Sequence, residues 1–222
     1  MSEAREAVFA SIRSALGRDR GTSPAPAPRN EEPAPGSPAD LDDPSRRVTR
    51  FTEILESLGA DVERVENVDA ARAAVARRVG ALEAREVAIS DSPLVRQLVG
   101  GLDAEVFDGS RDRERLLECD LGICSAQLGV AETGTLVFLS TSERHRLVSL
   151  VPPVHLAILR ASDIVVSLGE ALARAEETRE GSPPPLVSLV TGPSRTADIE
   201  LTLVVGVHGP RELQVVVLDD LA

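Results

Sequence analysis

The chain has 222 residues, and 42% of them are hydrophobic, which is enough for one domain with a sizeable core. Its formal net charge of −12 and its lack of Tyr and Trp argue against nucleic-acid binding, which relies on basic patches and stacking aromatic rings. All 24 basic residues are Arg. Without Lys the chain can form neither a Schiff base nor a Walker-type phosphate loop.

The N-terminal region predicts a helix on a flexible tether. Apolar side chains recur at helical spacing over residues 2–18, and seven prolines lie in the stretch that ends at Pro44. Such a proline-rich composition supports neither a helix nor a strand. We therefore predict an amphipathic helix in residues 1–20, a Pro/Ala-rich flexible linker in residues 21–45 and an α/β domain in residues 46–222.

The first half of the predicted domain alternates between helices and strands. Ser92 followed by Pro93 is a typical helix start. The expected helices cover about residues 46–58, 67–83, 92 onward and 111–118, and the expected strands cover residues 61–65, 86–90 and 104–107. This alternation indicates a parallel sheet covered by helices.

The second half predicts more strands with shorter connections. The strand candidates cover residues 121–126, 136–140, 147–151, 155–159, 186–190 and 213–218, and a helix capped by Ser162 covers residues 162–177. Short connections favour antiparallel neighbours. Together the two halves predict an α/β fold with a Rossmann-like mixed sheet.

Cysteine content and segment composition bound the cofactors and the compartment. Cys119 and Cys124 are too few for an ordinary iron–sulfur cluster, and their spacing is not that of a zinc site. Both lie in or beside apolar runs, so we expect buried, unreactive thiols and no metal or cofactor bound by this chain. The sequence shows neither a signal peptide nor an apolar run of membrane-spanning length, so we expect a cytoplasmic protein.

Three polar turns that contain glycine interrupt the apolar second half. The first is Glu132-Thr133-Gly134-Thr135, directly before a predicted strand. Gly134 permits a tight turn and a close approach of a ligand, and the two threonines offer hydroxyls. Glu132 stands where a general acid or base, or a carboxylate nucleophile, could act. The competing interpretation is a structural turn in which Glu132 caps neighbouring N–H groups.

The second turn follows the predicted strand that ends at Val190. Its glycine, polar and charged candidates are Gly192, Ser194, Arg195, Thr196, Asp198 and Glu200. Ligands of open α/β sheets bind at the carboxyl ends of strands, and an arginine beside free N–H groups favours an anion. The structural alternative is that Arg195 pairs with Asp198 or Glu200 while Thr196 caps a short helix.

The third turn places His208 between Gly206 and Gly209. The glycines leave the imidazole sterically open, and histidine titrates near neutral pH, which suits proton transfer. A lone histidine in a tight turn is also a common structural feature. We interpret the other two histidines as structural, because His145 lies in a charged turn and His155 begins a predicted strand. We predict that the three turns gather around one pocket suited to negative charge.

These three turns, in this order and spacing, resemble those of the LUD-domain family, and the resemblance covers about residues 46–220. It implies a fold of the ribose-5-phosphate isomerase and CoA-transferase type (NagB/RpiA/CoA transferase), in which a carboxylate and phosphate-binding turns sit at strand ends. By that likeness Glu132 and the Ser194–Thr196 turn are the best site candidates. The isomerases of this group use a lysine at the sugar-phosphate site, so the absence of Lys argues against that reaction.

The resemblance also implies a function. The chain resembles short members of the family, which support the oxidation of L-lactate to pyruvate together with iron–sulfur partner proteins. This chain would then be a subunit without a cluster that binds a small carboxylate or phosphate, while the clusters belong to its partners. Two alternatives stay open: a regulatory module that senses a small acid, and a stand-alone isomerase or acyl transferase. In the stand-alone enzyme Glu132 would be the base or nucleophile and His208 would carry protons.

Overall fold

The computed structural model describes residues 3–15, 39–109, 114–140, 146–177, 185–197 and 203–219. The chain divides into two units, one that ends at Gly36 and one that begins at Ser37. The first unit contains helix α1 (Glu3–Ala15), on which Val8 and Phe9 are exposed. Most of the predicted linker lies outside the described residues, as do the site candidates Asp198 and Glu200.

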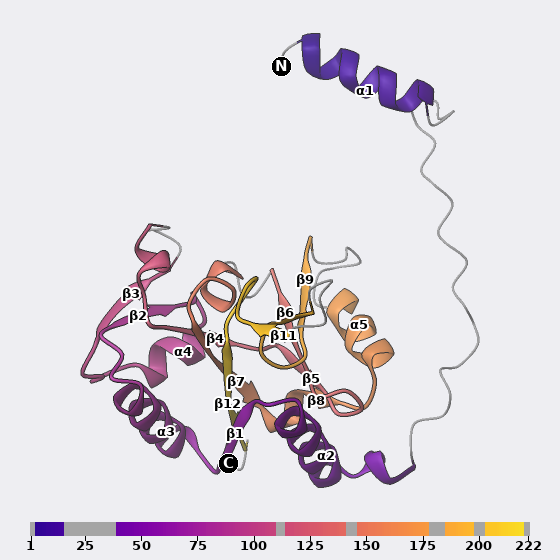
Figure 1. Cartoon of the computed structure of the whole chain (residues 1–222). Coiled ribbons are helices and arrows are strands. Elements are labelled where there is room, and N and C mark those ends of the chain that lie inside the picture. The colour runs from indigo at the N-terminus through magenta and orange to yellow at the C-terminus, as the bar shows by residue number, and fades with distance from the viewer. Residues whose placement is uncertain are drawn as a thin grey trace. The chain divides into compact units, whose positions relative to one another are not determined.

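A six-stranded parallel sheet forms the centre of the second unit (Figure 1). Its strands lie in the order β1-β12-β7-β4-β2-β3, and each neighbouring pair is parallel. Their bounds are β1 Asp61–Val65, β2 Glu86–Ile89, β3 Glu105–Asp108, β4 Leu121–Ser125, β7 Val154–Arg160 and β12 Glu212–Leu218. Strand β4 is buried along its whole length, as expected for a parallel sheet that is covered on both faces.

Helices cover both faces of this sheet (Figure 1). Their bounds are α2 Pro44–Ser57, α3 Val68–Ala81 and α4 Pro93–Leu98. Helices α3 and α4 pack on one face and α2 packs on the other. The side chains of Asp43, Asn67 and Ser92 accept hydrogen bonds from N–H groups in the first turns of these helices, which explains where the helices begin.

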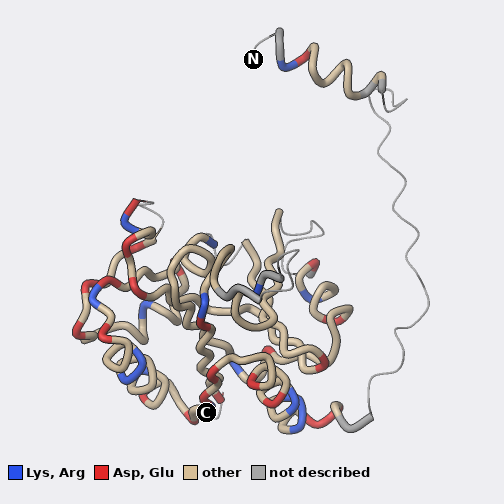
Figure 2. Tube along the Cα trace, in the orientation of Figure 1, with Lys and Arg blue, Asp and Glu red and all other residues tan. Residues whose placement is uncertain are grey.

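A second, four-stranded sheet packs on the same face as α2. Its strands are β5 Leu128–Val130, β6 Thr135–Leu139, β8 Ile164–Val165 and β9 Val187–Val190, in the order β8-β5-β6-β9. The β5–β6 and β6–β9 pairs are antiparallel, and these four strands carry no charged residue (Figure 2). Helix α5 (Leu168–Glu177) covers the outer face through Ala171 and Ala175. A hairpin of β10 (Arg195–Ala197) and β11 (Leu203–Val205) follows β9.

The expected α/β class is confirmed, with a mostly parallel sheet. The difference is that the strands form separate sheets, one wholly parallel and one that combines two antiparallel pairs with the parallel β5–β8 pair, whereas the sequence pattern suggested one mixed sheet. The strand at 155–159 was expected to have antiparallel neighbours, and this is wrong because β7 pairs in parallel with both β4 and β12. The chain leaves β4, builds β5 and β6 in the second sheet, and then returns to the first sheet, so β4 and β7 are joined by a long crossover.

Residues 147–151 were expected to form a strand, but the 3₁₀ helix η3 (Arg146–Ser149) begins this segment. The N–H groups of Leu150 and Val151 donate to the carbonyl of Leu147 and close the turn. Packing explains why this segment forms a turn and not a strand. The Val148 carbonyl lies so close to Gly122 that a Cβ atom on this glycine would be only 2.0 Å from the carbonyl oxygen. The apolar run therefore packs as a turn against β4.

Two helix predictions also change. In the predicted helix 111–118, the described part contains only the 3₁₀ helix η2 (Arg115–Leu117), and residues 111–113 lie outside the description. The helix expected from Ser162 begins later, at Leu168, since residues Ala161–Asp163 form a 3₁₀ turn that leads into β8. The Ser167 hydroxyl caps the later start by accepting a hydrogen bond from the Glu170 N–H.

Candidate functional site

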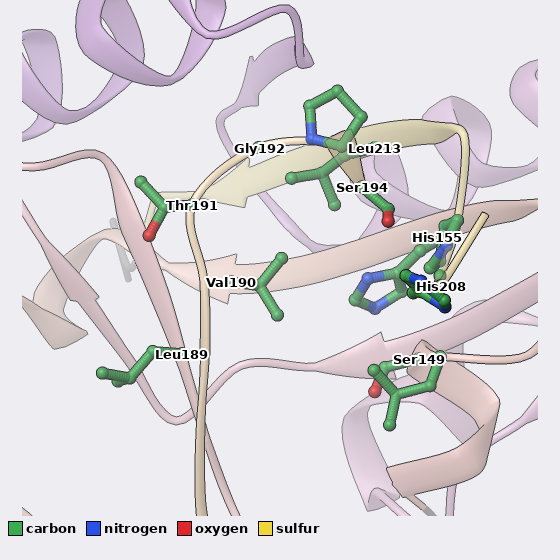
Figure 3. A pocket seen from close by; sticks show the side chains of 13 residues that line it. Ser149, His155, Leu189, Val190, Thr191, Gly192, Ser194, His208 and Leu213 are labelled. Atoms are coloured by element: carbon green, nitrogen blue, oxygen red, sulfur yellow. The ribbon is translucent and has the colours of Figure 1, made fainter. Parts of the chain in front are cut away.

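A cavity of about 170 Å³ lies where the second and third polar turns meet the two sheets (Figure 3). Its polar lining comes from Ser149, His155, Thr191, Ser194 and His208. The rest of the wall is made by leucine, valine, proline and glycine residues. Figure 3 shows β9 and its continuation on one side and the two histidines with Ser149 and Ser194 on the other.

The cavity lies at the amino ends of two central parallel strands. His155 is the second residue of β7, and its register partner Leu213 is the second residue of β12. The turn after Val190 does follow the carboxyl end of a strand, as predicted. That strand, β9, pairs antiparallel in the second sheet. The rule for ligands of open parallel sheets, on which the prediction relied, therefore does not apply to this turn.

The second and third turns are held together by main-chain hydrogen bonds. The Ser194 N–H donates to the Pro210 carbonyl at 2.9 Å, and the Gly206 N–H donates to the Ser194 carbonyl at 3.0 Å. This pairing brings Gly192, Ser194 and His208 to one cavity. Within the part of the chain that the structure describes, no hydrogen-bonding partner is found for the Ser194 hydroxyl or the His208 ring.

Arg195 does not line this cavity. Its side chain is exposed, and its guanidinium Nη2 donates to the Leu58 carbonyl at 2.6 Å. Leu58 is the C-cap of α2, where a positive charge is favourable because of the helix dipole. This contact gives Arg195 a structural partner, and its role as an anion ligand stays a prediction. Thr196 lies next to it in β10.

The first turn supports the cavity from outside. In the described chain the lining includes none of residues 132–135. A chain of hydroxyls connects the turn to the cavity, because Thr135 Oγ1 lies 2.7 Å from Thr133 Oγ1 and 2.8 Å from Thr191 Oγ1. Glu132 is half-buried, and its main-chain N–H donates to the Val166 carbonyl. The structure thus does not bring Glu132 to the cavity that His208 lines, and its catalytic role stays untested.

The structure adds His155, which the sequence reading treated as structural. The residue is only 1% exposed, its ring centroid lies 5.4 Å from that of Phe138, and its Nε2 atom has no hydrogen-bond partner. Burial lowers the pKa of His155 to about 4, so the ring is uncharged at neutral pH. The available signal was a histidine inside an otherwise apolar strand, because a polar side chain there must face the core or a cavity.

No group of three His, Cys, Asp or Glu side chains is arranged to hold a metal ion among the residues that the structure describes. Cys119 and Cys124 are both buried and form no disulfide, which confirms the expected buried thiols, and burial raises the pKa of Cys119 to about 11. None of the described helices has the length and apolar character of a membrane span.

Comparison with known proteins places the chain among related sequences. The family model of the LUD domain matches residues 48–218. An uncharacterized protein of Neisseria meningitidis serogroup B is 43% identical over 99 residues, which cover 45% of this chain and 42% of that protein. Lactate utilization protein C of Shouchella clausii is 38% identical over 116 residues, which cover 50% of this chain and 51% of that protein. The matched part thus spans about half the length of these curated relatives.

The fold has a counterpart among solved structures. The crystal structure of a DUF162 family protein from Deinococcus radiodurans is 25% identical and superposes with a TM-score of 0.60. The superposition covers 79% of this chain and 98% of that protein. The arrangement of sheets and helices described above is therefore that of a known domain. The finer prediction of the isomerase and CoA-transferase type stays a prediction.

Proposed function

Because this chain belongs to the LUD-domain family, we propose that it serves lactate utilization. It acts as a subunit that supports the oxidation of L-lactate to pyruvate together with iron–sulfur partner proteins. The observation that carries the proposal is the meeting of two family turns, with Ser194 and His208, in one cavity of the LUD domain. The name of the Shouchella clausii relative supports the same role.

The division of labour follows from the residues that the chain contains. With two cysteines, both buried, the chain lacks the thiolates that an ordinary cluster requires, so the redox centres belong to the partners. The contribution of this chain is then to bind a small carboxylate or similar anion. The described lining contains hydroxyls and imidazoles but no Asp or Glu side chain, so a bound carboxylate meets no like charge there.

The proposal is tested by reconstitution. The purified iron–sulfur partners are assayed for L-lactate-dependent reduction of an electron acceptor, with and without the full chain. We expect oxidation to require the chain, and we expect a pull-down from cells grown on lactate to recover iron-containing proteins with it. A Ser194→Ala, His208→Ala double variant should still recover the partners but lose rate. Full lactate oxidation by the partners alone would contradict the proposal.

A further inference from the structure

The cavity has one polar group whose place is otherwise unexplained. His155 belongs to the cavity wall, is almost fully buried, and has no partner for its Nε2 atom. Buried polar atoms in folded proteins are nearly always paired, and leaving one unpaired costs free energy. A histidine in this state at the wall of a cavity has a hydrogen bond left to make with a molecule that enters the cavity.

The strand pairing fixes the main chain of this residue, and the ring has two orientations of nearly the same shape. His155 lies within β7 between the paired strands β4 and β12, so its main chain is fixed. The Phe138 ring packs beside it at an interplanar angle of 47°. A half-turn of the imidazole about its Cβ–Cγ bond exchanges the positions of its nitrogens and carbons, so the ring can present a nitrogen to the cavity without moving the sheet.

The two histidines differ in a way that orients a ligand. His208 is exposed and lies with Ser194 in the paired turns, whereas His155 is buried in the sheet (Figure 3). A carboxylate loses less hydration at the exposed end, where a hydroxyl and an imidazole can donate to it. The buried end instead suits an uncharged oxygen. The apolar residues Val190 and Leu213 leave room for a short alkyl group between these ends.

We propose that the cavity binds a short 2-hydroxy or 2-oxo acid. Its hydroxyl or keto oxygen forms a hydrogen bond with the His155 ring, and its carboxylate faces Ser194 and His208. An uncharged imidazole has one N–H and one free lone pair, so it can accept a bond from a hydroxyl or donate one to a keto oxygen. This inference rests on the proposed function, since it names the substrate class of the same cavity.

The test is calorimetric titration of the purified full chain with L-lactate, pyruvate and propanoate. Propanoate has the same carbon chain and carboxylate but lacks the oxygen that His155 would bind. We expect lactate and pyruvate to bind about tenfold more tightly than propanoate, as one buried hydrogen bond predicts. Equal affinity of the wild-type chain for all three acids would overturn the inference, whatever the variants show.

Two variants locate the preference. His155→Phe should reduce lactate affinity to the level of propanoate and leave propanoate binding unchanged, while His208→Ala should weaken all three acids alike. If His155→Phe weakens propanoate as much as lactate, the ring is only structural and the inference fails. In case His155→Phe does not fold, nitrogen NMR of histidine-labelled wild-type chain gives the answer. Lactate should then shift the His155 ring signals, propanoate should not, and equal shifts would refute the assignment.

The outcome is separable from that of the reconstitution. If the chain prefers lactate to propanoate but the partners oxidise lactate fully without it, the proposed function falls and the binding site stands. If the partners require the chain but it shows no such preference, the inference about His155 falls and the proposed function stands.

Discussion

The buried His155 makes folding stability depend on pH within a defined window. Burial lowers the pKa of this ring from 6.5 to about 4, so the folded chain resists a proton that the unfolded chain accepts. The stability linked to this residue is therefore present above pH 6.5 and is lost as the pH falls from 6.5 towards 4. The difference between the two pKa values corresponds to a total loss of about 3 kcal/mol in the free energy of unfolding. About 2 kcal/mol of this loss is reached at pH 5.

The assay is urea unfolding of three proteins at pH 7 and at pH 5. Wild-type chain is compared with His155→Gln, which cannot titrate, and with His208→Gln, the matched control at the exposed histidine of the same cavity. The other ionisable residues are the same in all three proteins, so the difference between proteins isolates each histidine. We expect His155→Gln to lose about 2 kcal/mol less than wild type between the two pH values, while His208→Gln follows wild type. Equal losses in wild type and His155→Gln would refute the reasoning.

Three further predictions concern contacts and burial elsewhere in the second unit. Arg195→Ala removes the charged donor at the C-cap of α2 and should lower the free energy of unfolding by about 0.5–1 kcal/mol. The affinity for small acids, measured by calorimetry, should stay unchanged. A clear loss of that affinity would instead support the predicted role of Arg195 as an anion ligand. Gly134→Ala would place a Cβ 2.9 Å from the Leu55 nitrogen at a φ of 62°. It should cost about 2 kcal/mol in urea unfolding, whereas Gly80→Ala in α3, which meets nothing within 4 Å, should be neutral or slightly stabilising. Because Cys119 is buried with a pKa near 11, a thiol reagent at pH 8 should label it only after unfolding, and rapid labelling of native protein would contradict the described packing.

Local signals were sufficient where an element is specified by its own residues. Helix α4 was anticipated because Ser92 followed by Pro93 is a typical helix start, and the structure shows the Ser92 side chain accepting an N-cap hydrogen bond. The segment 147–151 was misjudged because a short apolar run fits either a strand or a buried turn. The close approach of Val148 to Gly122 decides between the two structures, and these residues are distant in the sequence.

The lining of the candidate cavity was anticipated in part for a similar reason. The pattern of residues named Ser194 and His208, and the structure brings both to one cavity. It also made Arg195 look functional and His155 look structural. Local sequence shows neither that the arginine reaches the end of α2 nor that the histidine is buried beside a cavity with an unpaired atom. Both facts depend on strands and helices that are far apart along the chain.

Packing against α2 explains the glycines of the first two turns, which reduces the number of residues that are candidates for ligand binding. Gly134 has a φ of 62° and lies against the Leu55 main chain, and Gly192 has a φ of 99° and lies against Leu58. Both therefore let a turn approach the last part of α2, where a side chain would clash or strain the backbone. A glycine in these motifs need not mark a ligand contact, because the helix already accounts for it. The hydroxyls of Ser149 and Thr191 already have hydrogen-bond partners, so the polar side chains of the cavity left for a ligand are Ser194, His208 and His155, and these carry the chemistry proposed above.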